Sequence, residues 1–236
     1  YKNWNILNEP YPEILIAAGK STVAASIAIR IKSNHKTFVV QLLNPRVKPT
    51  LFDMVVPHIH DKIYGENVFP TRGAINRVNN HLLQKELNNF ISDFSNIPKP
   101  IIAILIGGNS KHYKIDNQIS NEIFRKIKKT QDDYNAGLLI TFSRRTNPDL
   151  IEIFKEKLKN TNTFIWNSLG KNPYYAYLAF ADYIVVTEDS ISMTSEAAST
   201  GKPVYIINLP SNSEKFKMFH LDLNKEGITR TFNGQL

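Results

Sequence analysis

Residues 181–210, ADYIVVTEDSISMTSEAASTGKPVYIINLP, contain a strand, a turn, a helix and a second strand in one stretch. The β-branched residues at 184–186 form an apolar run that is typical of a strand buried on both faces. Residues 192–199 predict a short helix, and Gly201 stands where a helix end favours a positive φ. A second apolar run follows at 204–209. The stretch therefore predicts a β–α–β unit, which is the building block of α/β folds with a parallel sheet.

The turn between this strand and this helix carries Asp189, Ser190 and Ser192, and Glu196 follows about one turn into the helix. In open α/β sheets, ligands bind beyond the carboxyl ends of the strands, where helix N-termini present free N–H groups to anions. These residues are therefore candidates for a ligand site, in which Glu196 can accept hydrogen bonds from a ribose diol. The structural alternative is that Ser192 caps the helix and that Glu196 is a solvated or capping-box residue.

Composition restricts the class of protein. The chain has 236 residues, of which 42% are hydrophobic and 11% aromatic, and this indicates a globular protein with a sizeable core. It has no cysteine, which excludes disulfides, thiolate metal sites and a cysteine nucleophile. No apolar run approaches the roughly 18 residues that a transmembrane helix needs. No signal peptide is visible, and a start at Tyr1 is compatible with a fragment.

The net charge of +8 favours partners that carry phosphate: nucleotides, nucleic acids or an anionic membrane face. The Lys and Arg residues are spread along the chain, and no RNA- or DNA-binding motif occurs. We therefore do not expect nucleic acid as a partner. The expected location is cytoplasmic, with peripheral association at the inner membrane face as a further option.

Apolar runs and helical patterns alternate along the rest of the chain. Strands are predicted at 13–18, 37–43, 51–56, 68–70, 101–106, 137–142 and 163–166. Helices are predicted at 23–31, 79–94, 118–132, 149–159, 173–181 and within 214–233. The segment 95–100 contains two prolines and is the expected linker. We thus expect two α/β units with mainly parallel sheets facing across a cleft, residues 1–97 and residues 98–236.

Two more strand ends in the second half carry candidate ligand groups. The most apolar strand, 101–106, is followed by Gly107, Gly108, Asn109 and Ser110. Two adjacent glycines allow the backbone to approach a ligand closely. Arg144 and Arg145 follow the strand at 137–142, and guanidinium groups match phosphate oxygens bidentately. Solvated surface charge is the alternative for both arginines. The aromatic residues at 173–181 are assigned to core or interdomain packing.

In the first half, Gly19, Lys20 and Ser21 lie between a predicted strand and a predicted helix. A phosphate-binding P-loop also requires a glycine five positions before Gly19, where Ile14 stands, so an NTPase is not predicted. The turn can still meet a phosphate or an acceptor. The structural alternative is a tight turn with Thr22 as the helix cap.

The sequence HIHD, with His58, His60 and Asp61, follows the strand at 51–56. Its spacing is compatible with a metal site, but no further ligands are recognisable, and no metal is predicted. A general base at His60 or Asp61 that faces a cleft is more plausible than a metal site. The structural alternative is that these are ordinary polar residues of a loop after a strand.

Six segments together resemble one known family: GKSTVAASIAIR, QLLNPRVKPTLFDMVVPHIHD, IGGNSKHY, TFSRRT, NPYYAYLAFADYIVVTEDSISMTSEAASTGKPVYI and KFKMFHLDLNKEGITR. They resemble the mitochondrial-fission "elongated mitochondria" family, which comprises a plant organelle-division factor and bacterial relatives. The resemblance extends from about residue 13 to about residue 232. The family's glycine-rich first strand-turn and its final helix are expected to be missing here.

The resemblance implies a fold similar to that of two-domain GT-B glycosyltransferases and not to that of epimerases. These enzymes place the donor site in the second domain and the acceptor site in the first, and they need no metal or other obligatory cofactor. By this analogy Asp189, Ser190 and Ser192 meet the diphosphate of a nucleotide-sugar, and Glu196 binds its ribose. The family is often labelled as an epimerase. We expect no epimerase, because neither a full Gly-x-Gly-x-x-Gly motif nor a Tyr-x-x-x-Lys pair is present.

The expected function is therefore a metal-independent transferase that moves a sugar from a nucleotide-sugar to an envelope-type acceptor, with a lipid-linked acceptor or an anionic membrane surface as further partners. The turn at 107–110 together with Arg144 and Arg145 would neutralise the leaving diphosphate. His60 or Asp61 would be the base. The acceptor-side candidates are Gly19, Lys20, Ser21, Asn44 and Arg46.

Two alternatives stay open. One is a non-catalytic GT-B-like scaffold that recruits a protein partner, such as a membrane-remodelling GTPase, and such a scaffold would not need Arg144, Arg145 or Glu196. The other is a nucleotide-binding regulator, which would keep the donor pocket but lack an acceptor base. Because a fold does not fix a function, the cleft has to decide: the donor-pocket residues separate a transferase from a scaffold, and the acceptor base separates a transferase from a regulator.

Overall fold

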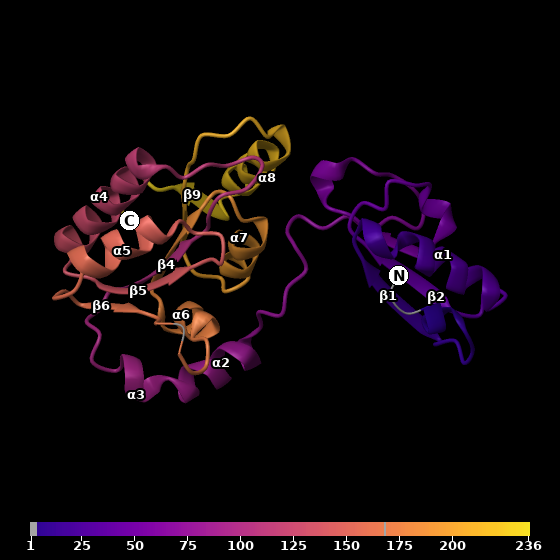
Figure 1. The fold of residues 1–236 in the computed structure, drawn as a ribbon, viewed down its shortest axis with the longest axis horizontal. Helices are drawn as coiled ribbons and strands as arrows, with labels where there is room; N and C mark the ends of the chain where they lie inside the picture. The colour runs from indigo at the N-terminus through magenta and orange to yellow at the C-terminus, as the bar shows by residue number, and fades with distance from the viewer. Residues whose placement is uncertain (1–3, 168) are drawn as a thin grey trace. The chain divides into compact units, whose positions relative to one another are not determined.

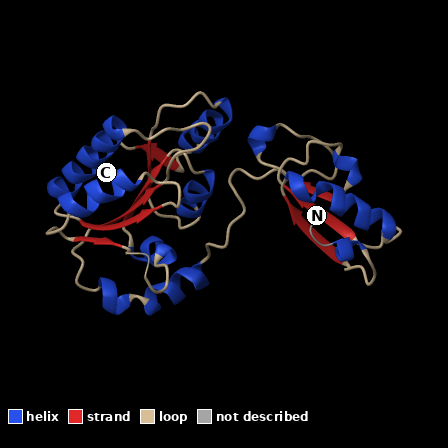
Figure 2. Cartoon of the chain, in the orientation of Figure 1, coloured by secondary structure: helices blue, strands red, loops and turns tan. Residues whose placement is uncertain are grey.

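The computed structural model describes residues 4–167 and 169–236, and the chain divides into two compact units, Tyr1–Gly73 and Ala74–Leu236. Each unit contains a parallel sheet with helices packed on it (Figures 1 and 2). The mainly parallel α/β architecture expected from the sequence is confirmed.

The first unit is built on a three-stranded parallel sheet of order β1-β2-β3. Its strands are β1 (Ile14–Ala18), β2 (Phe38–Leu42) and β3 (Met54–Val56), and its helix is α1 (Val23–Lys32). The 3-10 turns are η1 (Trp4–Leu7), η2 (Lys20–Thr22), η3 (Pro49–Leu51) and η4 (Ile59–Asp61). The strand expected at 68–70 is absent from the described elements, and only isolated bridges join Val68 to Val55 and Thr71 to His58.

One face of this small sheet is covered and the other is open among the described residues. Val39 and Val55 are buried, and they form a core with Val23 of α1 and Phe52. On the opposite face Ile14 is 61% exposed and Ile16 is 66% exposed. Alternate residues of a strand point to opposite faces, so this pattern shows that the first unit packs its sheet on α1 from one side.

The second unit contains a six-stranded, all-parallel sheet of order β6-β5-β4-β7-β8-β9. Its strands are β4 (Ile101–Ile106), β5 (Gly137–Phe142), β6 (Thr163–Ile165), β7 (Tyr183–Thr187), β8 (Val204–Ile207) and β9 (Thr229–Thr231). Its helices are α2 (Asn80–Asn89), α3 (Ile91–Phe94), α4 (Asn117–Tyr134), α5 (Pro148–Lys157), α6 (Tyr174–Phe180), α7 (Ile191–Ala198) and α8 (Glu214–Lys225). Gly201, after α7, has a φ of 72°, as its position in the sequence predicts.

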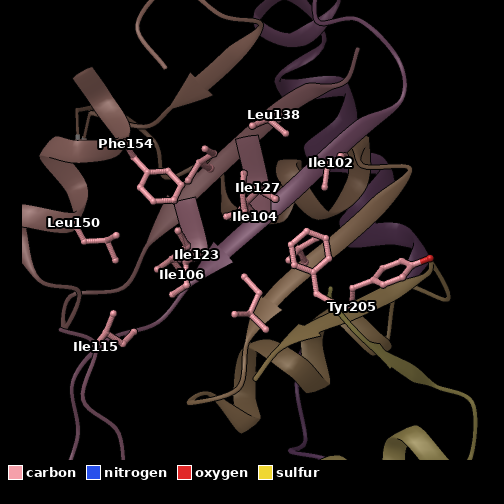
Figure 3. Packing of buried hydrophobic residues seen from close by; sticks show 14 of the residues in the cluster. Ile102, Ile104, Ile106, Ile115, Ile123, Ile127, Leu138, Leu150, Phe154 and Tyr205 are labelled. Carbon is pink, nitrogen blue, oxygen red and sulfur yellow. The ribbon is translucent and has the colours of Figure 1, made fainter. Parts of the chain in front are cut away.

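Helices cover both faces of this sheet (Figure 1). Figure 3 shows one of the two cores, in which the β4 residues Ile102, Ile104 and Ile106 pack against α4 and α5. The other core joins the alternate residues of β4 to α3, α6 and α7. Every residue of β4 is buried, which explains why its sequence is apolar without alternation.

The boundary between the units lies earlier than the proline-containing segment at which the sequence places it. Residues 74–97 belong to the second unit, because α2 packs on α6 and Phe94 of α3 is buried against Phe164 and Phe180. The segment 95–100 connects α3 to β4 inside this unit, where the Pro98 and Pro100 carbonyls both accept from the Gly137 N–H. Phe90, with a φ of −119°, also separates α2 from α3 within the single helix expected at 79–94.

No helix among the described residues is both long and apolar enough to cross a membrane.

Candidate functional site

The carboxyl ends of β4, β5 and β7 lie side by side in the second unit, because β4 is the central strand between the other two. From β4 the strands β5 and β6 continue to one side of the sheet, and β7, β8 and β9 continue to the other. Such a topological switch point leaves a crevice in which ligands bind. The turns after these strands contain most of the donor-side residues that the sequence singles out. The structure therefore brings the turns at 107–110, 143–146 and 188–190 together at one edge.

Asp189 connects these turns. Its side chain has no exposed surface, and its carboxylate accepts hydrogen bonds from the Gly108 N–H at 2.9 Å and the Thr187 hydroxyl at 2.7 Å. Arg145 Nη2 lies 3.3 Å from the same carboxylate. Because these donors already surround it, Asp189 acts as a structural link between β4, β5 and β7. We do not keep the interpretation that it faces a phosphate.

The two glycines after β4 are required by packing within the protein. A Cβ atom on Gly107 would overlap the Asp189 carboxylate, and one on Gly108 would overlap the Arg145 backbone. The backbone N–H groups of this turn also have acceptors: Gly107 donates to the Thr187 hydroxyl, Gly108 to Asp189, Asn109 to the Arg145 carbonyl and Ser110 to the Tyr113 carbonyl. The turn thus holds three strands together and leaves none of its four amides free for a phosphate.

The two arginines after β5 differ in their surroundings. Arg145 is held by Asp189 and by the Asn109 carbonyl, which accepts from Nη1 at 3.3 Å, while 47% of its side chain remains exposed. Arg144 is exposed, and no ion pair involves it in the described part of the chain. Arg145 is therefore a pre-oriented cation at the edge of the sheet, whereas Arg144 is an exposed surface charge.

Helix α7 begins at this edge, and its cap is Ser190. The Ser190 hydroxyl accepts from the Met193 N–H at 3.2 Å, whereas Ser192, the cap that the sequence analysis weighed, is exposed within the first turn. One turn further on, the Ser195 hydroxyl accepts from the Ala74 N–H at 2.8 Å. The hydrogen-bonded start of α7 is an electropositive end of a helix beside Arg145 and Asp189.

Glu196 of α7 is not a freely solvated side chain. The Tyr174 hydroxyl donates to Glu196 Oε2 at 2.6 Å, and the Tyr175 hydroxyl lies 3.5 Å from Oε1. Burial, followed by the negative charge of Glu196, raises the pKa of Tyr174 above its usual value, so this phenol stays protonated. No cationic side chain of the described residues forms an ion pair with Glu196. It is a half-buried carboxylate that neutral donors orient.

In the first unit, the Gly19–Ser21 turn follows β1 in a tight conformation, with a φ of 82° at Gly19. The buried Gln41 amide donates to the Gly19 carbonyl at 3.3 Å, and the Thr22 hydroxyl donates to the same carbonyl at 2.9 Å. Thr22 makes no side-chain cap of α1. Lys20 and Ser21 are exposed.

The other candidates of the first unit also lie at the carboxyl edge of its sheet. Asn44 and Arg46 follow β2, and Asn44 Oδ1 accepts from the Arg46 N–H at 2.8 Å, which shapes a local turn. His58 and His60 follow β3 with their rings stacked at 4.9 Å, and Asp61 closes a capping box with His58. No group of three or more metal-ligating side chains occurs among the described residues.

Two kinds of site residue escaped the sequence analysis. Thr146 and Thr187 sit at strand ends, and their hydroxyls join β4 to its neighbours; the Thr146 hydroxyl donates to the Gly107 carbonyl at 2.6 Å. The sequence analysis assigned the aromatic residues at 173–181 to packing. This is correct for Tyr177, which is fully buried, but it misses the contacts of Tyr174 and Tyr175 with Glu196. Only their position at the first turn of α6, which starts at the ligand-binding edge, distinguishes them in the sequence.

These features define the fold class: two α/β units, each with a parallel sheet, a GT-B-like fold that solved nucleotide-sugar enzymes share. One solved structure with this fold is UDP-GlcNAc 2-epimerase from Neisseria meningitidis bound to UDP-GlcNAc, with a TM-score of 0.60 and 16% identity. The similarity covers 94% of this chain and 64% of that chain.

Over residues 2–236 the sequence matches the family described as Mitochondrial fission ELM1, and the chain belongs to this family. It is 30% identical to "Mitochondrial fission protein ELM1" of Arabidopsis thaliana, over 94% of this chain and 58% of the relative's length. It is 31% identical to an uncharacterized protein of Rickettsia prowazekii (strain Madrid E), over 97% of this chain and 74% of that protein. The resemblance drawn from the sequence motifs is confirmed.

The fold comparison corrects one contrast drawn from the sequence. The family resemblance was taken to imply a GT-B-like fold that differs from the fold of epimerases. Structures named as UDP-GlcNAc 2-epimerases nevertheless share the fold, at TM-scores of 0.60. The contrast in fold is therefore wrong, and the rejection of an epimerase activity stays a prediction from the two motifs.

Proposed function

We propose that the second unit binds a nucleotide-sugar at the carboxyl ends of β4, β5 and β7, and that the protein transfers the sugar to an envelope-type acceptor. The observation that carries the proposal is Glu196. This carboxylate is half-buried without a cationic partner, it is oriented by tyrosine hydroxyls, and it lies on the helix that starts at the ligand-binding edge. A ribose diol supplies the two hydroxyl donors that such a carboxylate can still accept.

The diphosphate would lie near Arg145, Arg144 and the start of α7, where Ser190 and Ser192 are placed. Since the turn at 107–110 uses its own amides within the protein, we assign it the role of holding Arg145 through Asn109 and Asp189. The guanidinium is thus oriented before a ligand arrives, which reduces the reorganisation needed to stabilise a leaving diphosphate.

In the proposed reaction a hydroxyl of the acceptor attacks the anomeric carbon of the sugar. Its proton passes to a base, for which His60 and Asp61 are the candidates, while the bond between the anomeric carbon and the diphosphate oxygen breaks. The nucleoside diphosphate leaves with the electron pair of that bond. Gly19, Lys20, Ser21, Asn44 and Arg46 are the acceptor-side candidates. The net charge of +8 supports an acceptor held at an anionic membrane surface.

A second candidate function is a non-catalytic scaffold with a protein partner. The occupied amides of the turn at 107–110 favour it, because a dedicated phosphate cradle would keep such donors free. The Arabidopsis relative is named as a mitochondrial fission protein, a name that states no sugar transfer for that protein.

Thermal unfolding with a panel of UDP, GDP, ADP, CMP and their sugars tests the proposal. At 100 times its Kd, a nucleotide that binds only the folded protein adds about 2.7 kcal/mol, or several degrees of unfolding midpoint. The shift should be lost in Glu196→Ala and retained in Glu152→Ala, a control at an exposed acidic residue of α5. If no nucleotide at millimolar concentration moves the midpoint, the donor site is refuted and the scaffold is favoured.

A further inference from the structure

The contact between α6 and α7 at Glu196 gives Tyr174 a specific place in the proposed site. Tyr174 is the first residue of α6, which follows the β6 end of the sheet, whereas Glu196 lies on α7, which follows β7. The 2.6 Å bond between Tyr174 Oη and Glu196 Oε2 therefore joins two separate strand–helix connections at the same edge. A contact of this kind fixes the direction in which the carboxylate points.

Tyr174 is itself held from both sides. Its backbone N–H donates to the Asn172 side chain at 3.0 Å, and its ring packs edge-to-face on Tyr175 with the centroids 5.2 Å apart. The Arg77 guanidinium lies over the other tyrosine, 5.5 Å from the Tyr175 ring centroid. The phenol of Tyr174 can thus act as a rigid donor, because neither its main chain nor its ring is free to follow Glu196.

We propose that Tyr174 is a positioning residue that holds the Glu196 carboxylate in the orientation required to accept hydrogen bonds from the two ribose hydroxyls of the donor nucleotide. This inference rests on the proposed function of the second unit. It adds the feature that selects ribose: a carboxylate oriented by a neutral donor that does not neutralise its charge.

The stoichiometry of hydrogen bonds supports this role. An ionised carboxylate has about four acceptor positions on its two oxygens. Tyr174 takes one position on Oε2, and Tyr175 at 3.5 Å contributes at most a weak bond to Oε1. Two or more positions remain for a vicinal diol. A cationic side chain in place of Tyr174 would also hold Glu196, but it would neutralise the carboxylate and weaken it as a hydrogen-bond acceptor. The neutral phenol of Tyr174 leaves the negative charge of Glu196 in place.

The test measures binding of UDP and of 2′,3′-dideoxy-UDP to the full chain by titration calorimetry. Wild type should prefer UDP, and Glu196→Gln should remove most of that preference. Tyr174→Phe should weaken UDP binding roughly tenfold, the size expected for one lost hydrogen bond to a charged group, and leave dideoxy-UDP binding unchanged. Tyr175→Phe should have a smaller effect, since its hydroxyl is more distant. Tyr134→Phe is the matched control, because the Tyr134 hydroxyl bonds to the Leu236 backbone.

The outcomes separate this inference from the function on which it rests. If wild type prefers UDP, Glu196→Gln removes the preference and Tyr174→Phe keeps it in full, Tyr174 does not position Glu196, although the donor site stands. If Tyr174→Phe weakens both nucleotides equally, the role is structural and the inference is refuted as well. If wild type binds neither nucleotide, the donor site and the inference fail together. A selective loss for UDP supports both.

Discussion

The buried carboxylate of Asp189 permits a quantitative prediction, because replacement by Ala and by Asn removes different numbers of its hydrogen bonds. Ala deletes both buried interactions and leaves the Gly108 N–H and the Thr187 hydroxyl without this acceptor. An unsatisfied buried donor costs about 1 to 3 kcal/mol. The pair with the half-exposed Arg145 adds no more than about 1 kcal/mol. With about 1.5 to 2 kcal/mol for each of the two donors, Asp189→Ala should destabilise the second unit by about 3 to 5 kcal/mol.

Asn retains the shape of the side chain and one oxygen. That oxygen can accept from Gly108, and the amide group can donate to the Thr187 oxygen if the threonine hydroxyl turns to the Leu105 carbonyl, 3.5 Å away. Only the charge and one good bond are lost. We expect a cost of about 1 to 2 kcal/mol for Asp189→Asn, well below that of Ala.

Urea unfolding followed by tryptophan fluorescence measures the difference. The chain has two tryptophans, and a Trp4→Phe background leaves Trp166 as a reporter of the second unit. With a slope of about 2 kcal/mol per molar urea, Ala should lower the midpoint by about 1.5 to 2.5 M and Asn by less than about 1 M. Equal shifts for the two variants, or a shift below about 0.5 M for Ala, would refute the assignment of Asp189 as the link between the three strands.

Three further predictions concern other parts of the structure. Gly108→Ala should destabilise the second unit by more than about 3 kcal/mol, because its Cβ would overlap the Arg145 backbone. The same urea titration should show a smaller loss, about 1 to 2 kcal/mol, for Gly227→Ala, where the Cβ has open space and only the φ of 72° disfavours a side chain. Arg30→Met should lower stability at neutral pH, because the Arg30 hydrogen bond holds the pKa of Asp53 below its ordinary value of 3.8. This stabilisation is complete above the unfolded pKa and is lost as the pH falls through the folded pKa, so the difference between wild type and variant should shrink as the pH drops below about 3.8. Unfolding curves of both proteins at a series of pH values test this. His220 is buried, and its Nε2 donates to the Glu188 carbonyl at 2.8 Å. Burial lowers the pKa of His220 below the ordinary 6.5, so the stability of the protein should fall as the pH drops below about 6.5. His220→Gln should flatten that fall, and an unchanged pH profile in the variant would contradict the reasoning.

The strands and helices followed from local patterns that depend little on distant residues. The apolar runs that became β4 and β7 are buried on both faces, so their sequences carry no alternation and are easy to recognise. The segment at 68–70 was mistaken for a strand, because a short apolar run does not reveal whether a neighbouring strand pairs with it. The unit boundary was misplaced for a similar reason: prolines mark an irregular segment, but only the packing of α2 on α6 shows to which unit the preceding helix belongs.

The sequence by itself determined the α/β class, the parallel sheets, the family and the three turns that meet at the edge of the second sheet. It could do so because strand and helix periodicity, glycine turns and family motifs are encoded in neighbouring residues. The roles of the residues within those turns were decided only by the tertiary structure. Asp189 became a structural link and Tyr174 a partner of Glu196 because hydrogen bonds over 81 and 22 positions of the chain join them to groups that no local pattern connects. Such bonds arise from the order of the strands in the sheet, which places distant turns side by side.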